Sequence, residues 1–108
     1  MPADLSREIQ AASRELRRPD GDDYLSIAVA ETRRIATGAG VSERKVEIAA
    51  LENGIVPERY TRNMKILSTA DQIKMLAATV AVVGLGGLGG TAIEMLARMG
   101  IGRLILID

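Results

Sequence analysis

Hydrophobic residues at the start of the chain recur at helical spacing. Over residues 4–18 the apolar side chains fall on one narrow stripe, and charged residues occupy the rest of the surface. This pattern predicts an amphipathic helix, and the run Pro-Asp-Gly-Asp-Asp at 19–23 predicts the turn that ends it. The members of the stripe are Leu5, Ile9, Ala12 and Leu16.

Two more helices are expected before the middle of the chain. Apolar residues at helical spacing predict one over about 22–37, which Gly40 stops. Ser42 has the chemistry of an N-cap for the next helix, which ends at Asn53. Residues 1–56 are therefore predicted to form a helical N-terminal extension that packs without carrying chemistry.

The next segment predicts a helix that leads into a buried strand. Ser68 and Asp71 have the spacing of a capping box, which predicts a helix from there to about Ala77. Thr79–Val83 is rich in β-branched residues and almost wholly apolar, as is typical of a strand covered on both faces in a parallel sheet.

The pattern then changes back to helix and again to strand. Apolar residues at helical spacing over Leu88–Met99 predict a helix, and Gly100 ends it. Leu104–Ile107 predicts a second strand. The fold class is therefore α/β, with N-terminal helices followed by the first β-α-β unit of a Rossmann-like, doubly wound parallel sheet.

A glycine-rich turn joins the first strand to the following helix. Gly84, Gly86 and Gly89 fit the pattern G-x-G-x-x-G, in which one glycine permits the tight turn, one lets the backbone approach a phosphate, and one lets helix and strand pack closely. Asp108 follows the second strand, where a carboxylate would meet a ribose hydroxyl. The pattern alone does not distinguish ATP from a dinucleotide.

Only two strands are visible in the sequence, and both are apolar on both faces. A pair of parallel strands with one crossover helix cannot cover itself. We therefore expect the chain to be the truncated opening part of a larger α/β domain, or to borrow a partner.

Composition narrows the class of partner. Fourteen basic and fourteen acidic residues give a net charge of zero, so no global electrostatic attraction to nucleic acid or to an anionic membrane is expected. Cysteine and histidine are absent, so no metal site is expected in this segment. Asp4, Arg7 and Glu8 interrupt any secretory signal, and a cytoplasmic protein is the expectation.

A long uncharged run raises the alternative of a membrane span. Met75–Ile93 carries no charge, and Gly86 and Gly90 match a membrane packing motif. Each glycine in a helix interior costs up to about 1 kcal/mol. The glycines between Gly84 and Gly90 therefore favour strand, loop and helix over a membrane span.

Two arginines flank a tyrosine in the connection before the capping box. Arg59 and Arg62 fit a solvated surface patch, which is the ordinary role of such residues. They also fit a phosphate clamp, because a guanidinium matches phosphate oxygens and keeps its charge at any working pH. The residues alone leave both interpretations open.

Several short motifs of the second half of the chain occur together and in a familiar order. They are Glu58-Arg59-Tyr60-x-Arg62-Asn63, Leu67-Ser68, Gln72, Val80-x-Val-Val-Gly-x-Gly-Gly-Leu-Gly-Gly90, Leu96-Ala-Arg98-x-Gly-Ile-Gly102 and Leu106-Ile-Asp108.

In these motifs the chain resembles the ThiF/MoeB/HesA adenylating enzymes, relatives of the ubiquitin-activating enzymes. The resemblance covers Glu58 to Asp108, and residues 1–56 contribute little to it. It implies that 57–108 is the incomplete N-terminal part of a ThiF-type nucleotide-binding domain. It also implies ATP-dependent adenylation of the C-terminal glycine of a ubiquitin-like protein, such as a sulfur carrier, by a homodimer.

The resemblance assigns roles to six residues. The glycines are expected to hold the nucleotide through their backbone, with Mg²⁺ accompanying ATP. Asp108 is expected to bind the ribose, and Arg62 to reach across the homodimer to the neighbour's triphosphate as a catalytic residue. The glycines are Gly84, Gly86, Gly87 and Gly89.

Other parts of the family's machinery match nothing in this sequence. They are a catalytic aspartate, a further arginine and lysine, and zinc-binding cysteine pairs, and in the family all of them follow the position of Asp108. Zinc is therefore expected only in such a C-terminal part. The chain as given is not expected to complete adenylation.

Two alternatives to the adenylating enzyme stay open. One is a Rossmann oxidoreductase that binds NAD or FAD, because Gly84, Gly86, Gly89 and Asp108 also fit a dinucleotide. NADP is disfavoured, since Asp108 would repel a 2′-phosphate. The other is a non-catalytic oligomerisation module whose helices wrap a partner.

Overall fold

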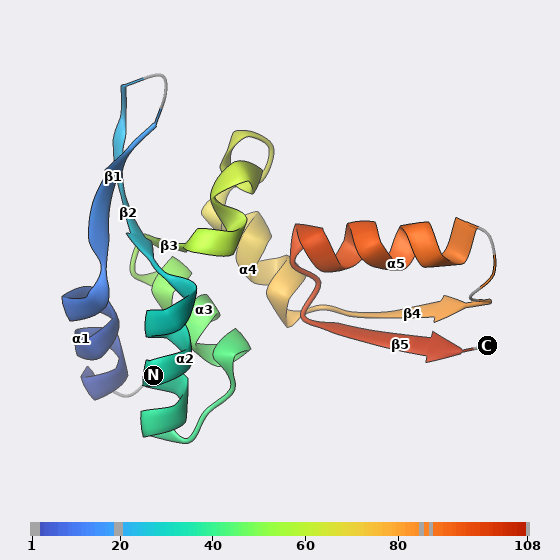
Figure 1. Cartoon of the computed structure of the whole chain (residues 1–108), viewed down its shortest axis with the longest axis horizontal. Coiled ribbons are helices and arrows are strands. Elements are labelled where there is room, and N and C mark those ends of the chain that lie inside the picture. Colours follow the sequence, from blue (N-terminus) through green and yellow to red (C-terminus); the bar gives the residue numbers. More distant parts are fainter. Residues whose placement is uncertain (1–2, 19–20, 85, 87, 108) are drawn as a thin grey trace.

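A computed structural model of the chain describes residues 3–18, 21–84, 86 and 88–107. The molecule measures 43 × 37 × 22 Å along its principal axes and has two parts. Figure 1 shows a body made of the N-terminal elements and an arm that extends from it. The arm consists of β4 (Thr79–Val83), α5 (Leu88–Met99) and β5 (Arg103–Ile107).

The body combines helices with a small sheet. Its strands are arranged in the order β1-β2-β3, with β1 antiparallel and β3 parallel to the central strand. In chain order the elements are α1 (Ala3–Ala12), β1 (Arg14–Arg17), β2 (Asp23–Ile27), α2 (Val29–Ala39), α3 (Glu43–Glu52), β3 (Ile55–Pro57), the 3₁₀ helix η1 (Glu58–Lys65) and α4 (Thr69–Ala77).

The helix predicted over 4–18 is wrong in its second half. The α-helix ends at Ala12, and 14–17 forms a strand that pairs with 23–26 in a hairpin. The amide of Arg18 donates to the carbonyl of Asp22 over 2.8 Å and closes the turn. Leu16 continues the helical stripe and yet lies in the strand. At this position the pairing of the backbone with β2 therefore outweighs the helical pattern of the sequence.

The second predicted helix begins later than expected for the same reason. Residues 23–27 form the central strand β2, and α2 starts only at Val29. Gly40 ends it in the left-handed region at φ 68°, as expected. The N-terminal part is therefore a mixed α/β body and not a purely helical extension, while the division of the chain at residue 56 stays a prediction.

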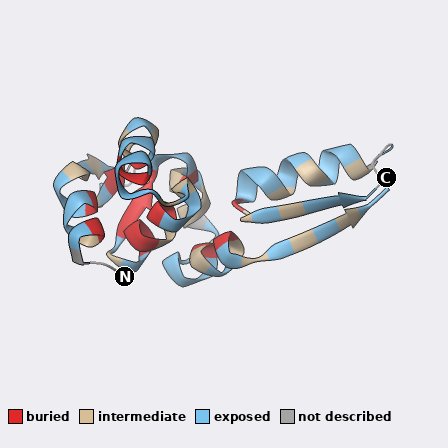
Figure 2. Cartoon of the chain, turned by 90° about the horizontal axis from the view of Figure 1, so that it is seen from below, coloured by how far each residue is buried: buried red, intermediate tan, exposed pale blue. Residues whose placement is uncertain are grey.

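Two clusters of buried hydrophobic side chains hold the body together. The larger one draws its side chains from three helices and two strands (Figure 2). The smaller one consists of Leu51, Tyr60 and Leu76. The helices predicted from Ser42 and from Ser68 are confirmed. The hydroxyl oxygen of each serine accepts a hydrogen bond from a backbone amide of the first turn, as expected of an N-cap. The core residues include Leu5, Ile9, Ile27, Ile35, Val46 and Ile55.

The arm confirms the predicted β-α-β unit. β4 and β5 are parallel, with Thr79 opposite Arg103 and Val83 opposite Ile107. The expectation that Thr79–Val83 is covered on both faces is wrong within this chain, because its residues alternate between exposed and half-buried. The reason is that α5 is the element of the arm that covers this sheet, so the other face meets solvent (Figures 1 and 2).

The uncharged run Met75–Ile93 folds as the end of α4, then β4, then the loop and the start of α5. This confirms the order of strand, loop and helix that its glycines favour. Within the described ranges, no helix combines the length and the hydrophobicity that a membrane crossing needs.

Candidate functional site

The glycine-rich turn lies at the far end of the arm, between β4 and α5. Gly84 adopts φ 82°, in the left-handed region that side chains rarely enter. Its amide donates to the carbonyl of Ile107 over 2.7 Å, which holds the ends of the two strands together. The first glycine therefore makes the tight turn, as its place in the motif predicts.

The other two described glycines of the motif differ in what surrounds them. A Cβ built on Gly89 would collide with the carbonyl oxygen of Gly84, so a glycine is needed for α5 to begin this close to β4. A Cβ on Gly86 would meet no heavy atom within 4 Å. Since the protein itself leaves that space empty, Gly86 fits the role of the glycine that admits a ligand.

Two of the predicted site residues, Gly87 and Asp108, lie outside the residues that the structure describes. The backbone next to each of them is nevertheless placed. Gly86 and the start of α5 flank the first, and Ile107 at the end of β5 precedes the second. Val83 and Ile107 lie side by side at the ends of the two parallel strands. The chain therefore leaves β4 and β5 at the same edge of the sheet.

Arg62 lies on the exposed side of η1. Among the described residues, neither an ion pair nor a hydrogen bond engages its guanidinium group. Arg59 differs, because it contacts the carboxylates of Glu43 and Glu47 at 3.6 and 3.3 Å. The phosphate-clamp interpretation therefore survives for Arg62 alone, since Arg59 is held by acidic residues of α3.

Arg62 and the glycine-rich turn lie near opposite ends of α5 in one chain. Its neighbour Asn63 donates to the carbonyl of Met99, at the C-terminal end of α5. The glycine-rich turn precedes the N-terminal end of the same helix (Figure 1). Twelve helical residues span about 18 Å. The structure thus does not bring Arg62 together with the turn within one chain.

Three further motif residues join the body to the arm. Gln72 donates to the carbonyl of Met99 over 2.9 Å, and Asn63 donates to Gln72 over the same distance. Tyr60 is buried and lies against Gly100, where a Cβ would come within 3.0 Å of the ring. These residues hold the end of α5 in place, a structural role that the sequence did not reveal.

Sequence reasoning also missed a buried carboxylate at the junction of body and arm. The side chain of Glu47 is 5% exposed and pairs with Arg59. Burial raises the pKa of Glu47, although Arg59 opposes the shift and Glu43 adds to it. Burial likewise raises the pKa of Tyr60, and the neighbouring charge of Glu47 contributes. The helical spacing with Val46 and Ala50 was the one available signal that Glu47 lies beside the buried face of α3.

The raised pKa of Glu47 predicts a pH-dependent stability. The folded state holds this proton more tightly than the unfolded state, so the stability contributed by Glu47 is fully present below its ordinary value of 4.5 and is lost as pH rises through the raised value. We expect the free energy of unfolding of Glu47→Gln, relative to the native chain, to increase from pH 4 to 7 in urea titrations. Glu52→Gln, on the exposed side of the same helix, controls for the loss of one charge. A constant difference for Glu47→Gln would contradict the assignment.

Two hollows of the surface are lined by described residues that lie away from the glycine-rich turn. One of about 340 Å³ lies where body and arm meet and includes Glu47, Arg59 and Gly102. Another of about 200 Å³ lies within the body, beside η1 and α4. Among the described residues, no cluster of three acidic side chains, histidines or cysteines is arranged to hold a metal ion.

The fold and the turn together define the class of this part of the chain. A parallel β-α-β unit with a glycine at positive φ after its first strand, and a close helix approach enforced by a second glycine, belongs to the Rossmann-like folds. Residues 60–108 match the model of the ThiF family. The chain belongs to the ThiF family, and the match lies in this half.

Curated relatives agree with that membership. HesA (heterocyst) of Trichormus variabilis is 52% identical over 52 residues, which cover 46% of this chain and 20% of that protein. Ubiquitin-like modifier-activating enzyme 5 of Bombyx mori is 37% identical over 84 residues, 73% of this chain and 21% of the relative.

A third relative extends the similarity into the body. Adenylyltransferase and sulfurtransferase MOCS3 of Bos taurus is 32% identical over 106 residues, which cover 96% of this chain and 23% of that protein. The chain spans about a fifth of the length of each of these three relatives. No solved structure gave a significant match.

Proposed function

We propose that this chain supplies the nucleotide-binding start of an enzyme that adenylates the C-terminal glycine of a ubiquitin-like sulfur carrier with ATP. The carboxylate of the carrier attacks the α-phosphate, the bond between α- and β-phosphate breaks, and pyrophosphate leaves with its Mg²⁺. An acyl adenylate results. The names of the ubiquitin-like modifier-activating enzyme and of MOCS3 among the relatives support this reaction class.

The observation that carries the proposal is the arrangement of the three glycines. Gly84 turns the backbone, Gly89 lets the helix begin close to the strand, and Gly86 leaves space that the protein does not fill. Backbone amides at the start of a helix favour an anion by up to about 2 kcal/mol. The triphosphate would lie there, with Gly87 adding a backbone contact and Asp108 binding the ribose.

Arg62 completes the proposed site from a second copy of the chain. Its guanidinium is available on the surface of η1, and α5 separates it from the turn of its own chain. An arginine at that place can therefore contact a triphosphate only across an interface. We accordingly propose a homodimer in which each Arg62 contributes to the neighbour's nucleotide site.

Nucleotide binding can be tested on the chain itself. We expect an ATP titration followed by NMR to shift the amides of 84–89 in a saturable way. A parallel titration with NAD separates the oxidoreductase alternative, because NAD that displaces ATP and binds more tightly would favour a dinucleotide site. Shifts confined to the body would count against both.

The chemical step needs the rest of a catalytic domain. Replacing the aligned segment of bovine MOCS3 with this chain provides one, since the two align over 96% of the chain. We expect the hybrid enzyme to catalyse ATP–pyrophosphate exchange that depends on a ubiquitin-like sulfur carrier. A folded hybrid without exchange would overturn the adenylation proposal, whereas the NMR titration would still report on nucleotide binding.

A further inference from the structure

The residue that follows Arg62 is anchored, although Arg62 itself is exposed. The carbonyl oxygen of Asn63 accepts from two backbone amides that follow η1, over 2.9 and 2.7 Å. Its side-chain Nδ2 donates to Oε1 of Gln72 over 2.9 Å and to the carbonyl of Met99 over 3.2 Å. The backbone beside Arg62 is therefore held in place, while the guanidinium extends from it toward solvent.

Gln72 completes this arrangement from α4. Its Nε2 donates to the carbonyl of Met99 over 2.9 Å, so three hydrogen bonds join the amides of Gln72 and Asn63 to one carbonyl. That carbonyl is among the last four of α5, which find no partner inside the helix. Because an amide oxygen only accepts and an amide nitrogen only donates, the closed set allows one orientation of each side-chain amide.

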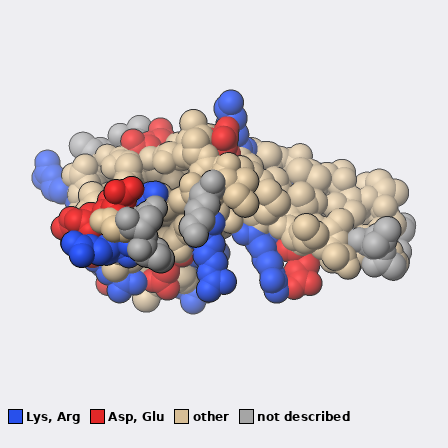
Figure 3. All heavy atoms as spheres, turned by 90° about the horizontal axis from the view of Figure 1, so that it is seen from above, with Lys and Arg blue, Asp and Glu red and all other residues tan. Residues whose placement is uncertain are grey.

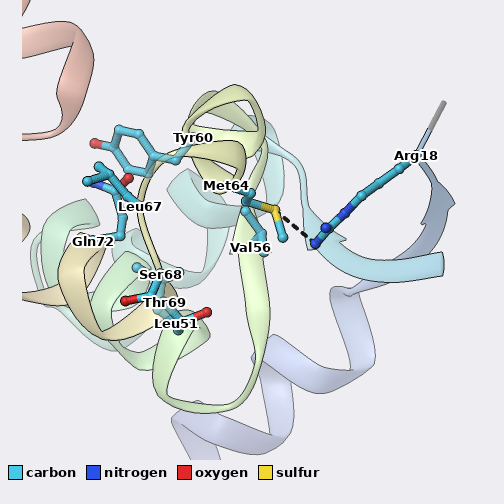
Figure 4. A pocket seen from close by; sticks show the side chains of 9 residues that line it. All are labelled: Arg18, Leu51, Val56, Tyr60, Met64, Leu67, Ser68, Thr69 and Gln72. Atoms are coloured by element: carbon cyan, nitrogen blue, oxygen red, sulfur yellow. Dashed lines mark hydrogen bonds between the residues drawn. The ribbon is translucent and has the colours of Figure 1, made fainter. Parts of the chain in front are cut away.

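Gln72 itself is firmly placed. The residue is 3% exposed, and it lies in the first turn of α4, next to the capping box of Ser68 and Asp71. Its side chain and that of Tyr60 lie next to each other where η1 meets α4 (Figure 4). Both lie against Gly100, because a Cβ built on this glycine would collide with the two side chains. A buried amide on a capped helix can therefore set the position of η1.

The position of η1 matters for the proposed reaction because Arg62 has to meet a group on another chain. In the proposed homodimer its guanidinium contacts the neighbour's triphosphate, while α5 begins at the glycine-rich turn of its own chain. Misplacing a group by about 1 Å can cost about 10²-fold in rate. A residue that fixes η1 on the end of α5 therefore controls how well Arg62 acts.

We propose that Gln72 is a positioning residue for Arg62. Through Asn63 it holds η1 on the C-terminal end of α5, so that Arg62 is presented to the neighbour's triphosphate in one place. Gln72 touches neither the nucleotide nor the carrier in this arrangement. The inference rests on the proposed function, because it concerns the same adenylation site.

The anchoring can be measured by NMR on the chain itself. Gln72→Met keeps the length of the side chain and removes its hydrogen bonds to Asn63 and Met99. We expect the backbone order parameters of residues 61–63 to fall from about 0.85, the value of a rigid backbone, toward about 0.6. Gln10→Met, on the exposed side of α1, is the matched control and should leave them unchanged.

Native order parameters at 61–63 in Gln72→Met would show that the amide does not hold η1, and would overturn the proposal. If the buried substitution prevents folding, Asn63→Ala decides by the same measurement. It removes the link from the side of η1, at a position that is only half-buried.

A double-mutant cycle in the MOCS3 hybrid tests whether Gln72 acts through Arg62. We expect Gln72→Met to lower pyrophosphate exchange by about 10- to 10²-fold. In the Arg62→Ala background the same substitution should change the rate by less than about twofold, because the group that it positions is gone. Gln10→Met should exchange as the native hybrid does.

The outcomes separate the positioning role from the proposed function. Equal factors in both backgrounds would indicate a general structural loss and overturn the positioning role, while exchange by the native hybrid would still support adenylation. Native exchange in Gln72→Met would overturn the positioning role in the same way. A folded hybrid without any exchange would remove the adenylation proposal and the positioning role together.

Discussion

Replacement of Gly86 by valine should abolish ATP binding while leaving thermal unfolding of the chain unchanged. A Cβ at this position would meet no protein atom within 4 Å, and the residue is exposed, so the fold has no reason to reject a side chain. The same side chain would occupy the space that the proposed site reserves for phosphate. ATP titration by NMR measures the first effect, and circular dichroism melting measures the second.

Gly89→Ala is the matched control within the same turn. Its Cβ would collide with the carbonyl oxygen of Gly84 and lie 3.2 Å from the carbonyl carbon, so α5 must move away from β4. We expect this variant to lose stability in the arm whether or not ATP is present. If Gly86→Val kept the native affinity for ATP, the loop would not be the phosphate site. If Gly86→Val lowered the melting temperature as much as Gly89→Ala does, the space around Gly86 would not be free to accept a ligand.

Local signals in the sequence predicted the arm well. The strand at 79–83, the helix at 88–99 and the glycine at 100 follow from hydrophobic spacing and from backbone freedom, and each is specified within a few residues. The N-cap at Ser42 and the capping box of Ser68 and Asp71 were predictable for the same reason. In the arm the sequence pattern and the observed elements agree because each segment fits a single period, that of a strand or that of a helix.

The body was harder to predict because residues of β1 and β2 also fit a helical spacing, and strand pairing decides between the two. Leu16 fits a helical stripe with Ile9 as well as a strand, and the choice is made by the hydrogen bonds of β1 with β2. The third strand, 55–57, pairs with β2 from about thirty residues away and is too short to give a period of its own. In these segments the tertiary contacts of the strands outweigh the local pattern of the sequence.

Charge also divides the two parts in a way that composition conceals. The net charge is zero, yet Figure 3 shows basic and acidic side chains gathered on the body, while the arm is nearly uncharged in that view. The arm carries large exposed apolar side chains, among them Val83, Met95 and Leu106. The net charge of the whole sequence cannot distinguish these two surfaces, because it carries no information on where the fold places each side chain.

The motif around Arg62 shows both the strength and the limit of a resemblance. Its residues occur together, but the structure gives them different tasks: Tyr60 and Asn63 join body and arm, and Arg59 pairs with Glu47. Within the described part of the chain, Arg62 is the charged residue of the motif that makes no ion pair. The sequence could not separate these tasks, because they depend on which groups of α3 and α5 lie next to η1.

Mixed dimers should reveal whether Arg62 acts across an interface. In the MOCS3 hybrid we expect Arg62→Ala to lower pyrophosphate exchange by about 10²- to 10³-fold, the usual cost of removing one group that stabilises transition-state charge. Asp108→Ala should also inactivate, because the ribose contact is lost from the other side of the same site. Each substitution alone damages both sites of a homodimer.

Mixing the two inactive variants should then restore activity. A mixed dimer has one site with Asp108 from one chain and Arg62 from the other, and its second site lacks both. Random exchange of subunits makes half of the dimers mixed, so about a quarter of the native exchange rate should return. Measured rates that stay at the level of the single variants would show that Arg62 serves its own chain. Because about 18 Å of α5 lies between Arg62 and that chain's turn, such a result would require α5 to be rearranged in the active enzyme.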